Sequence, residues 1–301
     1  RQYSSGGPIT KDNTSVEYYC TIFTAMESSL EKDHLWTGSD DGLVHFSRDG
    51  GKNWTNVTPA NTPKWMMWNA IEVDPFRKGV IYITGTRYKL DDYTPYIYKT
   101  EDYGQSWQLI TKGISAMHFT RVMRADHKRA GLLYAGTEFG MYISYDGGAN
   151  WQPFQLNLPL VPITDLTIKN NDLIVATQGR SVWMIDDLSM VQQADPSALI
   201  KSIHIYRATD SYRVSGISTR WGSMSVPANS ATNPPKGAVI NFWLKDEVMD
   251  STQASVSILD PAGKLVRRLL LLPKKMSSSS KKGLINLCGI LSTLRQKKSM
   301  D

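Results

Sequence analysis

The sequence has little cysteine and no long hydrophobic run, and each absence excludes a class of protein. Only Cys20 and Cys288 are present among 301 residues. Two cysteines cannot build a disulfide framework or a cysteine-ligated metal site. No apolar run approaches the roughly 18 residues that a transmembrane helix requires. The sequence therefore predicts neither a disulfide-rich fold nor a membrane span.

Residues 1–266 also lack an excess of positive charge. The chain has 34 Lys and Arg against 28 Asp and Glu, a net charge of +6, but residues 267–301 contain nine of the bases and one acid. Residues 1–266 therefore contain 25 bases and 27 acids. Because nucleic-acid binding needs a basic face on the folded part, the sequence argues against that class. The five histidines show no metal-ligand spacing and there is no glycine-rich phosphate loop, so we expect no metal and no cofactor.

What the chain does contain is an eight-residue repeat, Ser/Thr-x-Asp-x-Gly-x-x-Trp. Its three copies are Ser47–Trp54, Thr100–Trp107 and Ser144–Trp151, which we call the boxes. They begin 53 and 44 residues apart, which is the size of one four-stranded propeller blade. A repeat of this period predicts an array of similar β-sheets.

The segments before each box repeat as well. Short β-rich runs at 35–39, 81–86, 133–137 and 174–179 end near glycine, and apolar runs at 18–26, 68–73, 119–124 and 163–168 precede them. One unit thus has an inner strand, a second strand, a third strand, a box and an outer strand. Four units extend from about residue 18 to about residue 187, and no box follows the third strand of the fourth.

The box residues have a structural explanation. Asp and Gly favour a tight turn between antiparallel strands, where the carboxylate accepts backbone N–H groups, and the Trp ring packs on the sheet. We therefore expect a structural role, and no chemistry, for the following nine residues: Asp49, Gly51, Trp54, Asp102, Gly104, Trp107, Asp146, Gly148 and Trp151.

The boxes resemble the Asp-box, or BNR, repeats of sialidase-like and sortilin-like β-propellers. The similarity is greater to large exported bacterial BNR-repeat proteins, often labelled glycosyl hydrolase, and it extends over roughly residues 5–268. The segments that carry it, besides the boxes, are 6–14, 38–43, 88–93, 162–166 and 176–181. This resemblance implies an all-β fold, a partial propeller of about four blades followed by a truncated β-sandwich.

Composition divides the chain further. We assign residues 1–190 to closing blades of a propeller, 191–235 to a polar, proline-containing linker and 236–268 to the start of a sandwich. Residues 269–301 form a low-complexity tail. Our hypothesis is that this tail is frameshifted, because another frame of 288–296 can encode a sandwich motif of the family; a basic disordered terminus is the alternative. The chain begins with Arg1, without an initiator Met or a signal peptide, so we take it as an internal piece of a longer protein.

Propeller ligands generally bind where the inner strands and the loops leading into them converge. Besides the site residues named at the end of this paragraph, Asp40, Asp41 and Asp91 are polar residues at these places in the repeat. We expect blade symmetry to gather five residues around one axis, with the boxes outside. The predicted ligand-binding residues are Arg87, Arg121, Glu138, Asp165 and Arg180, and the candidate catalytic carboxylates are Asp165, Glu138 and Asp92.

The function predicted from this pattern is a module that binds a glycan or a polypeptide. The alternative is a glycoside hydrolase, which needs two carboxylates at a defined separation. The resemblance implies a secreted, periplasmic or cell-surface protein. The expected partners are the ligand and the remaining blades of the full-length protein, and we expect no nucleic-acid partner.

Overall fold

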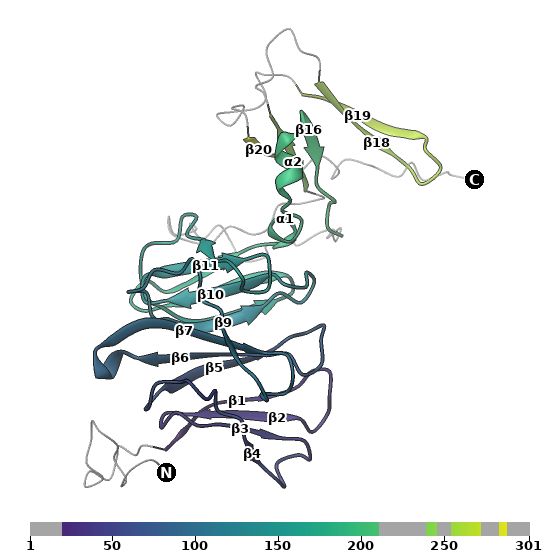
Figure 1. The fold of residues 1–301 in the computed structure, drawn as a ribbon. Helices are drawn as coiled ribbons and strands as arrows, with labels where there is room; N and C mark the ends of the chain where they lie inside the picture. Colours follow the sequence, from purple (N-terminus) through teal and green to yellow (C-terminus); the bar gives the residue numbers. More distant parts are fainter. Residues whose placement is uncertain (1–19, 211–238, 246–253, 272–282, 288–301) are drawn as a thin grey trace, which may run out of the picture. The chain divides into compact units, whose positions relative to one another are not determined.

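The computed structural model describes residues 20–210, 239–245, 254–271 and 283–287 and divides into two compact units, residues 1–187 and 188–301. The described part of the first unit consists of strands and one 3-10 turn, η1 (Tyr88–Leu90) (Figure 1). Its strands are β1 (Ile22–Glu27), β2 (Leu35–Ser39), β3 (Val44–Ser47), β4 (Thr55–Asn56), β5 (Met67–Val73), β6 (Ile81–Arg87), β7 (Asp92–Thr100), β8 (Gln108–Leu109), β9 (Thr120–Ala125), β10 (Leu133–Thr137), β11 (Gly140–Ser144), β12 (Gln152–Pro153), β13 (Ile163–Lys169), β14 (Asp172–Thr177) and β15 (Val182–Ile185).

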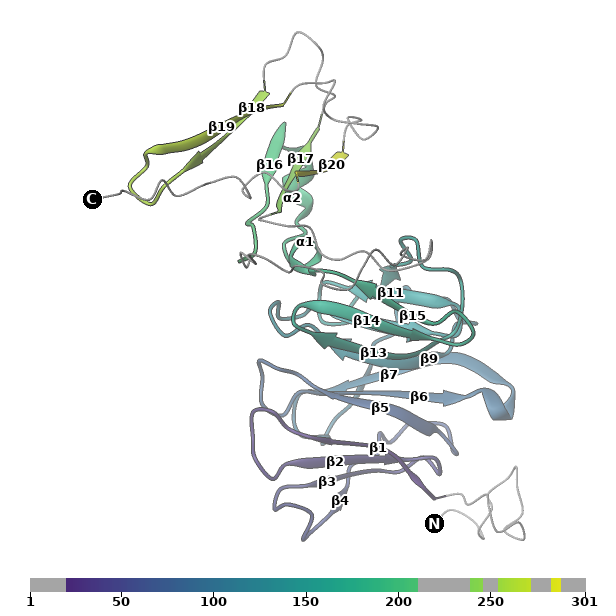
Figure 2. The ribbon, with the colours of Figure 1, turned by 180° about the vertical axis from the view of Figure 1, so that it is seen from behind.

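These strands form successive antiparallel sheets in chain order. Three sheets have four strands, β1–β4, β5–β8 and β9–β12, and the fourth has three, β13–β15 (Figures 1 and 2). The first strands of neighbouring sheets contact one another. The predicted all-β fold, a partial propeller of about four blades, is confirmed, and we refer to the sheets as blades 1 to 4.

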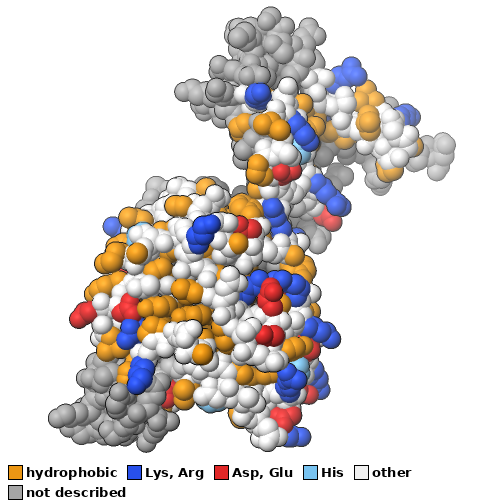
Figure 3. Space-filling model, viewed as in Figure 1, with side chains coloured by type: hydrophobic (Ala, Val, Ile, Leu, Met, Phe, Trp, Pro, Cys, Tyr) orange, Lys and Arg blue, Asp and Glu red, His pale blue; other side chains and the backbone are white. Residues whose placement is uncertain are grey.

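The antiparallel order gives each blade two different ends. One end holds the connection from the first to the second strand and the connection from the third to the fourth strand. The boxes lie in the latter connection, so we call this the box end. The connection between second and third strands lies at the other end, which we call the η1 end because η1 joins β6 to β7 there. In Figure 3 hydrophobic side chains gather toward the η1 end, on the left, and charged side chains toward the box end.

Apolar residues between neighbouring blades form the core. One buried cluster joins Trp36 and Phe46 of blade 1 to Trp68, Ile71 and Ile83 of blade 2, and a second cluster joins blades 2 and 3. The blades approach closely because the second strands of blades 1 to 3 carry a glycine. A Cβ on Gly38 would lie 2.7 Å from Trp68 Cβ, and one on Gly136 would lie 2.6 Å from Ile163 Cγ2. The repeated glycines are thus a packing requirement.

The three boxes have the same hydrogen bonds. In the first, Ser47 Oγ donates to Asp49 Oδ1 over 2.8 Å and accepts from Gly51 N over 2.9 Å, while Asp49 Oδ1 accepts from Asn53 N over 2.9 Å. The other boxes repeat these bonds around Asp102 and Asp146. The backbone and side-chain donors of Asn53 and the Ser47 hydroxyl lower the pKa of Asp49 to about 2.

The box tryptophans tie each blade to the preceding one. Trp107 Nε1 donates to Val57 O over 2.7 Å, and Trp151 Nε1 donates to Ile110 O over 2.7 Å. Both acceptors lie just after the outer strand of the preceding blade. Trp54, in blade 1, is 42% exposed, whereas Trp151 is 5% exposed. The box therefore stabilises the contact between blades as well as its own turn.

A second repeated turn was not found by our sequence analysis. Asp74 Oδ1 accepts from the backbone of Phe76 and Arg77, and its Oδ2 accepts from Tyr82 Oη over 3.2 Å. Asp126 repeats this pattern in blade 3, with Tyr134 Oη donating over 3.2 Å. Both carboxylates are buried. Their hydrogen bonds give them the structural role that a buried carboxylate requires.

The described part of the second unit contains two short helices, α1 (Ser189–Gln192) and α2 (Pro196–Ile200), and two small sheets. One sheet has β16 (Ile203–Ile205), β17 (Ile240–Leu244) and β20 (Gly283–Leu287), and the other has β18 (Ala254–Leu259) and β19 (Leu265–Leu271). No helix among the described residues is long and apolar enough to cross a membrane.

Parts of the predicted linker and tail are structured. Residues 191–205, assigned to the linker by composition, contain the end of α1, all of α2 and β16, where Asp195 caps α2 by accepting from Ser197 N over 2.8 Å. Gly283–Leu287, within the predicted tail, pairs with β17. Residues 211–235 of the linker, and residues 272–282 and 288–301 of the tail, lie outside the described residues.

Candidate ligand-binding site

Each first strand contains a bulge at the same place near the η1 end. The register shifts between Ile22 and Thr24 in β1, and again at the corresponding pairs in β5, β9 and β13. A bulge re-aims a side chain and is frequent next to functional sites. The residue left without a paired residue at the bulge is Phe23 in β1, Asn69 in β5, Arg121 in β9 and Thr164 in β13. Arg121, predicted from the sequence as a ligand residue, is thus a bulge residue.

Arg121 is held between an acid and two aromatic rings. Its Nη2 and Nε lie 2.6 Å and 2.8 Å from Glu138 Oε2. The guanidinium carbon lies 5.1 Å from the ring centre of Phe119 and 5.6 Å from that of Tyr88. The Tyr88 and Phe119 rings stack at 5.3 Å, and Tyr93 lies 6.0 Å from Phe119. Ion pairing and cation–π attraction fix the position of this arginine.

Arg87 forms the neighbouring pair at the same end of blade 2. Its Nη1 lies 2.5 Å from Asp92 Oδ2, and its Nε donates to Lys64 O over 3.0 Å. Tyr96 Oη donates to the same Asp92 oxygen over 2.8 Å. Burial raises the pKa of Asp92, but hydrogen bonds from Tyr96, Thr94 and Arg87 outweigh it and hold this pKa below its ordinary value. Asp92 is therefore ionised near neutral pH.

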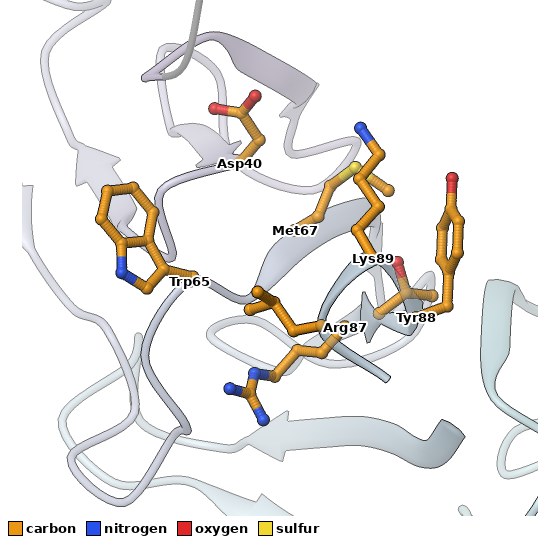
Figure 4. A pocket seen from close by; sticks show the side chains of 8 residues that line it. Asp40, Trp65, Met67, Arg87, Tyr88 and Lys89 are labelled. Atoms are coloured by element: carbon orange, nitrogen blue, oxygen red, sulfur yellow. The ribbon is translucent and has the colours of Figure 1, made fainter. Parts of the chain in front are cut away.

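A shallow pocket of about 10 Å³, room for about one water molecule, lies between blades 1 and 2 at this end. Trp65 and Tyr88 flank it on opposite sides, with Arg87 below and Asp40 above (Figure 4). Trp65 has a φ of +60°, which is a strained conformation for a bulky residue. Burial raises the pKa of Asp40, although hydrogen bonds from Thr21 and Cys20 lower it. Strain of this kind clusters at ligand sites.

Exposed aromatic side chains continue this surface onto blade 3. Tyr93 is 40% exposed and Phe139 is 45% exposed, and the Phe139 ring lies 5.0 Å from His118. Tyr93 and Phe139, together with Trp65, Tyr88 and Arg121, form what we call the aromatic face, and the buried Phe119 ring stacks against Tyr88. This face combines apolar rings with fixed polar groups, which is typical of ligand sites.

Asp165 has a different partner from those predicted. Its Oδ1 lies 3.0 Å from Arg124 Nη2, and Arg124 Nε donates to Leu166 O over 2.8 Å. Arg124 Nη1 lies 3.8 Å from Glu72 Oε2, and Glu72 Oε1 accepts from Ala125 N over 3.0 Å. β5, β9 and β13 thus each contribute one member of a Glu72–Arg124–Asp165 cluster.

Sequence reasoning missed Glu72 and Arg124. Each stands two residues before the buried aspartate of the repeated turn, Asp74 or Asp126, so an alignment of the repeats could have singled out both. Burial is the largest influence on Glu72 and raises its pKa to about 7, although Arg124 and the Ala125 N–H lower it.

The predicted ligand residues form separate ion pairs. Arg121 and Glu138 pair directly, Arg87 pairs with Asp92, and Asp165 pairs with Arg124. The exposed side chain of Arg180 forms no ion pair with another described residue, and its carbonyl accepts from Trp183 Nε1 over 2.8 Å. No cluster that could hold a metal ion occurs in the part of the chain that the structure describes.

The pKa of Glu72 predicts a pH dependence of stability. Between pH 4.5 and about 7 the unfolded chain loses the Glu72 proton while the folded chain retains it, so rising pH lowers the free energy of unfolding. At 1.36 kcal/mol per pKa unit the loss is about 3 kcal/mol. In urea denaturation, the free energy of unfolding of Glu72→Gln, relative to that of the parent protein, should therefore rise by about 3 kcal/mol between pH 4.5 and pH 8.

Glu101→Gln is a control of opposite sign for this experiment. The hydrogen bond from Lys99 lowers the pKa of Glu101, so the parent protein should gain stability relative to this variant as the pH rises. A difference between Glu72→Gln and the parent protein that stays constant across the pH range would contradict the shift at Glu72.

Comparisons with known proteins give structural matches of low sequence identity. No protein-family model and no curated protein matches the chain. Among solved structures it is similar to "YCF48 bound to D1 peptide", with 22% identity, 55% of this chain and 52% of that chain covered, and a TM-score of 0.43. YCF48 from Cyanidioschyzon merolae gives 16% identity, 55% and 53% coverage and a TM-score of 0.42.

A xyloglucanase of family GH74 from Xanthomonas campestris is a further match. The identity is 15%, the alignment covers 62% of this chain and 32% of that chain, and the TM-score is 0.43. The chain thus spans about half of the first two structures and about a third of this one. The matched proteins are β-propellers.

Proposed function

We propose that the chain is a glycan-binding module whose ligand rests on the aromatic face, with Arg121 as its central polar contact. The observation that carries the proposal is the immobilised Arg121, paired with Glu138 and placed over Tyr88 and Phe119. Arginine suits the recognition of hydroxyl or carboxylate groups, because its planar group donates paired hydrogen bonds.

The aromatic residues favour a glycan over a polypeptide. The polarised C–H bonds of a sugar ring stack on the negative face of an aromatic ring, and paired charges nearby bond its hydroxyls. Trp65, Tyr88, Tyr93 and Phe139 offer rings at this end. Asp92 and Glu138 are both engaged by arginines, so the face presents little unpaired charge for a charged peptide.

The wider context is part of the same proposal. The boxes and the segments shared with BNR-repeat proteins support an Asp-box propeller of the sortilin-like kind, in which this module is one part of an exported, multidomain protein. We place that protein in the secreted, periplasmic or cell-surface compartment. A polypeptide ligand is the alternative that the experiment below separates.

One observation favours the hydrolase as second candidate. Asp40 lines the shallow pocket and its pKa is raised, whereas Asp92, which pairs with the pocket residue Arg87, has a lowered pKa. Opposite shifts of two carboxyl groups in one site are typical of an acid and its charged partner. In that mechanism Asp40 donates a proton to the leaving oxygen. Asp40→Asn should then abolish release of reducing sugar while leaving binding intact, whereas a binding module releases none.

The experiment is a titration of the full chain with neutral oligosaccharides and with unstructured peptides. Arg121→Ala should weaken oligosaccharide binding by about tenfold or more, the effect of losing a charged hydrogen bond, while the melting temperature changes little. Asp102→Ala, in a box, should lower the melting temperature and preserve binding. Equal oligosaccharide affinity in Arg121→Ala, or binding of the peptides alone, would contradict the proposal.

A further inference from the structure

The box end of the four blades contains a cavity of about 450 Å³ that the aromatic face does not include. All four first strands line it, through Met26, Glu72, Arg124 and Ile168 among others. This volume is within the range of sites for small ligands. Because the boxes lie on outer hairpins, they leave this cavity free.

Glu72 and Arg124 face one another in the cavity without forming a close hydrogen bond. The 3.8 Å between Arg124 Nη1 and Glu72 Oε2 exceeds hydrogen-bond length. Arg124 uses three of its five N–H groups on Leu166 O, Met123 O and Asp165 Oδ1. Among the contacts of the described residues, no hydrogen bond uses the other two N–H groups, so both are available to a ligand.

We propose that this cavity binds a carboxylate-bearing ligand, which Arg124 holds through its guanidinium and to which Glu72 donates a hydrogen bond. A ligand oxygen between the two side chains would receive donors from both. Lys169 in the lining of the cavity adds positive charge, while the apolar walls from Met26, Val73 and Ile168 suit the ligand's carbon skeleton. A hexuronate or another small organic acid fits this description.

The proton on Glu72 makes this binding depend on pH. Burial holds the pKa of Glu72 at about 7, so the neutral, donating form is available below neutrality. The charged groups that face Glu72 are Arg124 from β9, Asp165 from β13 and Asp74 at the end of β5, and Glu27, His127 and Lys169 also line the cavity or its rim. A bound carboxylate opposes the loss of this proton, so binding should fade as the pH rises.

The test is a titration of the full chain with D-glucuronate and, as the neutral match, D-glucose. Glucuronate should bind at pH 6 and about tenfold more weakly at pH 8, since the neutral form of Glu72 falls by that factor. Glucose should not bind in the cavity. Glu72→Gln, which keeps an N–H donor and has no charge to gain, should bind glucuronate equally at both pH values.

Two further variants complete the test. Arg124→Met should abolish glucuronate binding at both pH values, and Glu101→Gln, whose side chain does not line the cavity, should leave it unchanged. No binding of glucuronate at pH 6, or an unaltered pH dependence in Glu72→Gln, would overturn the proposal. A negative result for glucuronate would not contradict oligosaccharide binding by the aromatic face, because the two sites share no residue.

Discussion

Replacing Trp151 with alanine should lower the free energy of unfolding by about 4 kcal/mol, the range for removing a buried tryptophan. The ring is 5% exposed in the cluster that joins blades 2 and 3, and its Nε1 donates to Ile110 O over 2.7 Å. The substitution removes apolar contacts and leaves this carbonyl without its partner. Urea denaturation followed by circular dichroism measures the loss.

Trp54 provides the matched control for Trp151. It occupies the same position of its box but is 42% exposed, so Trp54→Ala should cost about 1 kcal/mol. Similar losses in the two variants would show that the box tryptophans stabilise their own turns and do not join the blades.

Gly113→Ala should be strongly destabilising, with an expected loss of at least about 3 kcal/mol from overpacking and left-handed strain. An added Cβ would lie 2.1 Å from Trp151 O, and Gly113 has a φ of +100°. The clash involves backbone of the next blade, which cannot rotate away. Lys112, next to Gly113, also accepts a hydrogen bond from Trp151 N over 2.8 Å.

Gly179→Ala separates the effect of overpacking from the effect of left-handed backbone strain. Gly179 has a φ of +82°, and a Cβ there would meet nothing within 4 Å. This variant should show the left-handed strain alone, about 1 to 2 kcal/mol. An equal loss in Gly113→Ala and Gly179→Ala, measured by denaturation, would show that blades 2 and 3 do not approach closely at Gly113.

The repeating parts of the fold could be predicted because their physical causes are local. Asp49, its neighbours and the equivalent residues of the other boxes form hydrogen bonds within eight residues, so their spacing in the sequence fixes their geometry. The glycines of the second strands repeat for a different reason, since Gly38 and Gly136 each admit a large side chain from the first strand of the next blade.

The candidate site could be predicted only in part, because its contacts depend on bulges and on neighbouring blades. Arg121 lies on β9 and Glu138 directly follows β10, the adjacent strand of blade 3, so their pairing follows from the repeat. Asp165, by contrast, pairs with Arg124 of the preceding blade, a contact that no spacing within one blade indicates. The raised pKa of Glu72 likewise depends on burial and on Arg124 and Asp165, which belong to the two following blades.

The measurement that tests the account most directly is the affinity of the full chain for neutral oligosaccharides, compared between Arg121→Ala and Asp102→Ala. We expect Arg121→Ala to lose about tenfold or more in affinity at a nearly constant melting temperature, while Asp102→Ala keeps its affinity and melts at a lower temperature. Loss of binding in Asp102→Ala with binding retained in Arg121→Ala would place the ligand at the boxes and contradict it.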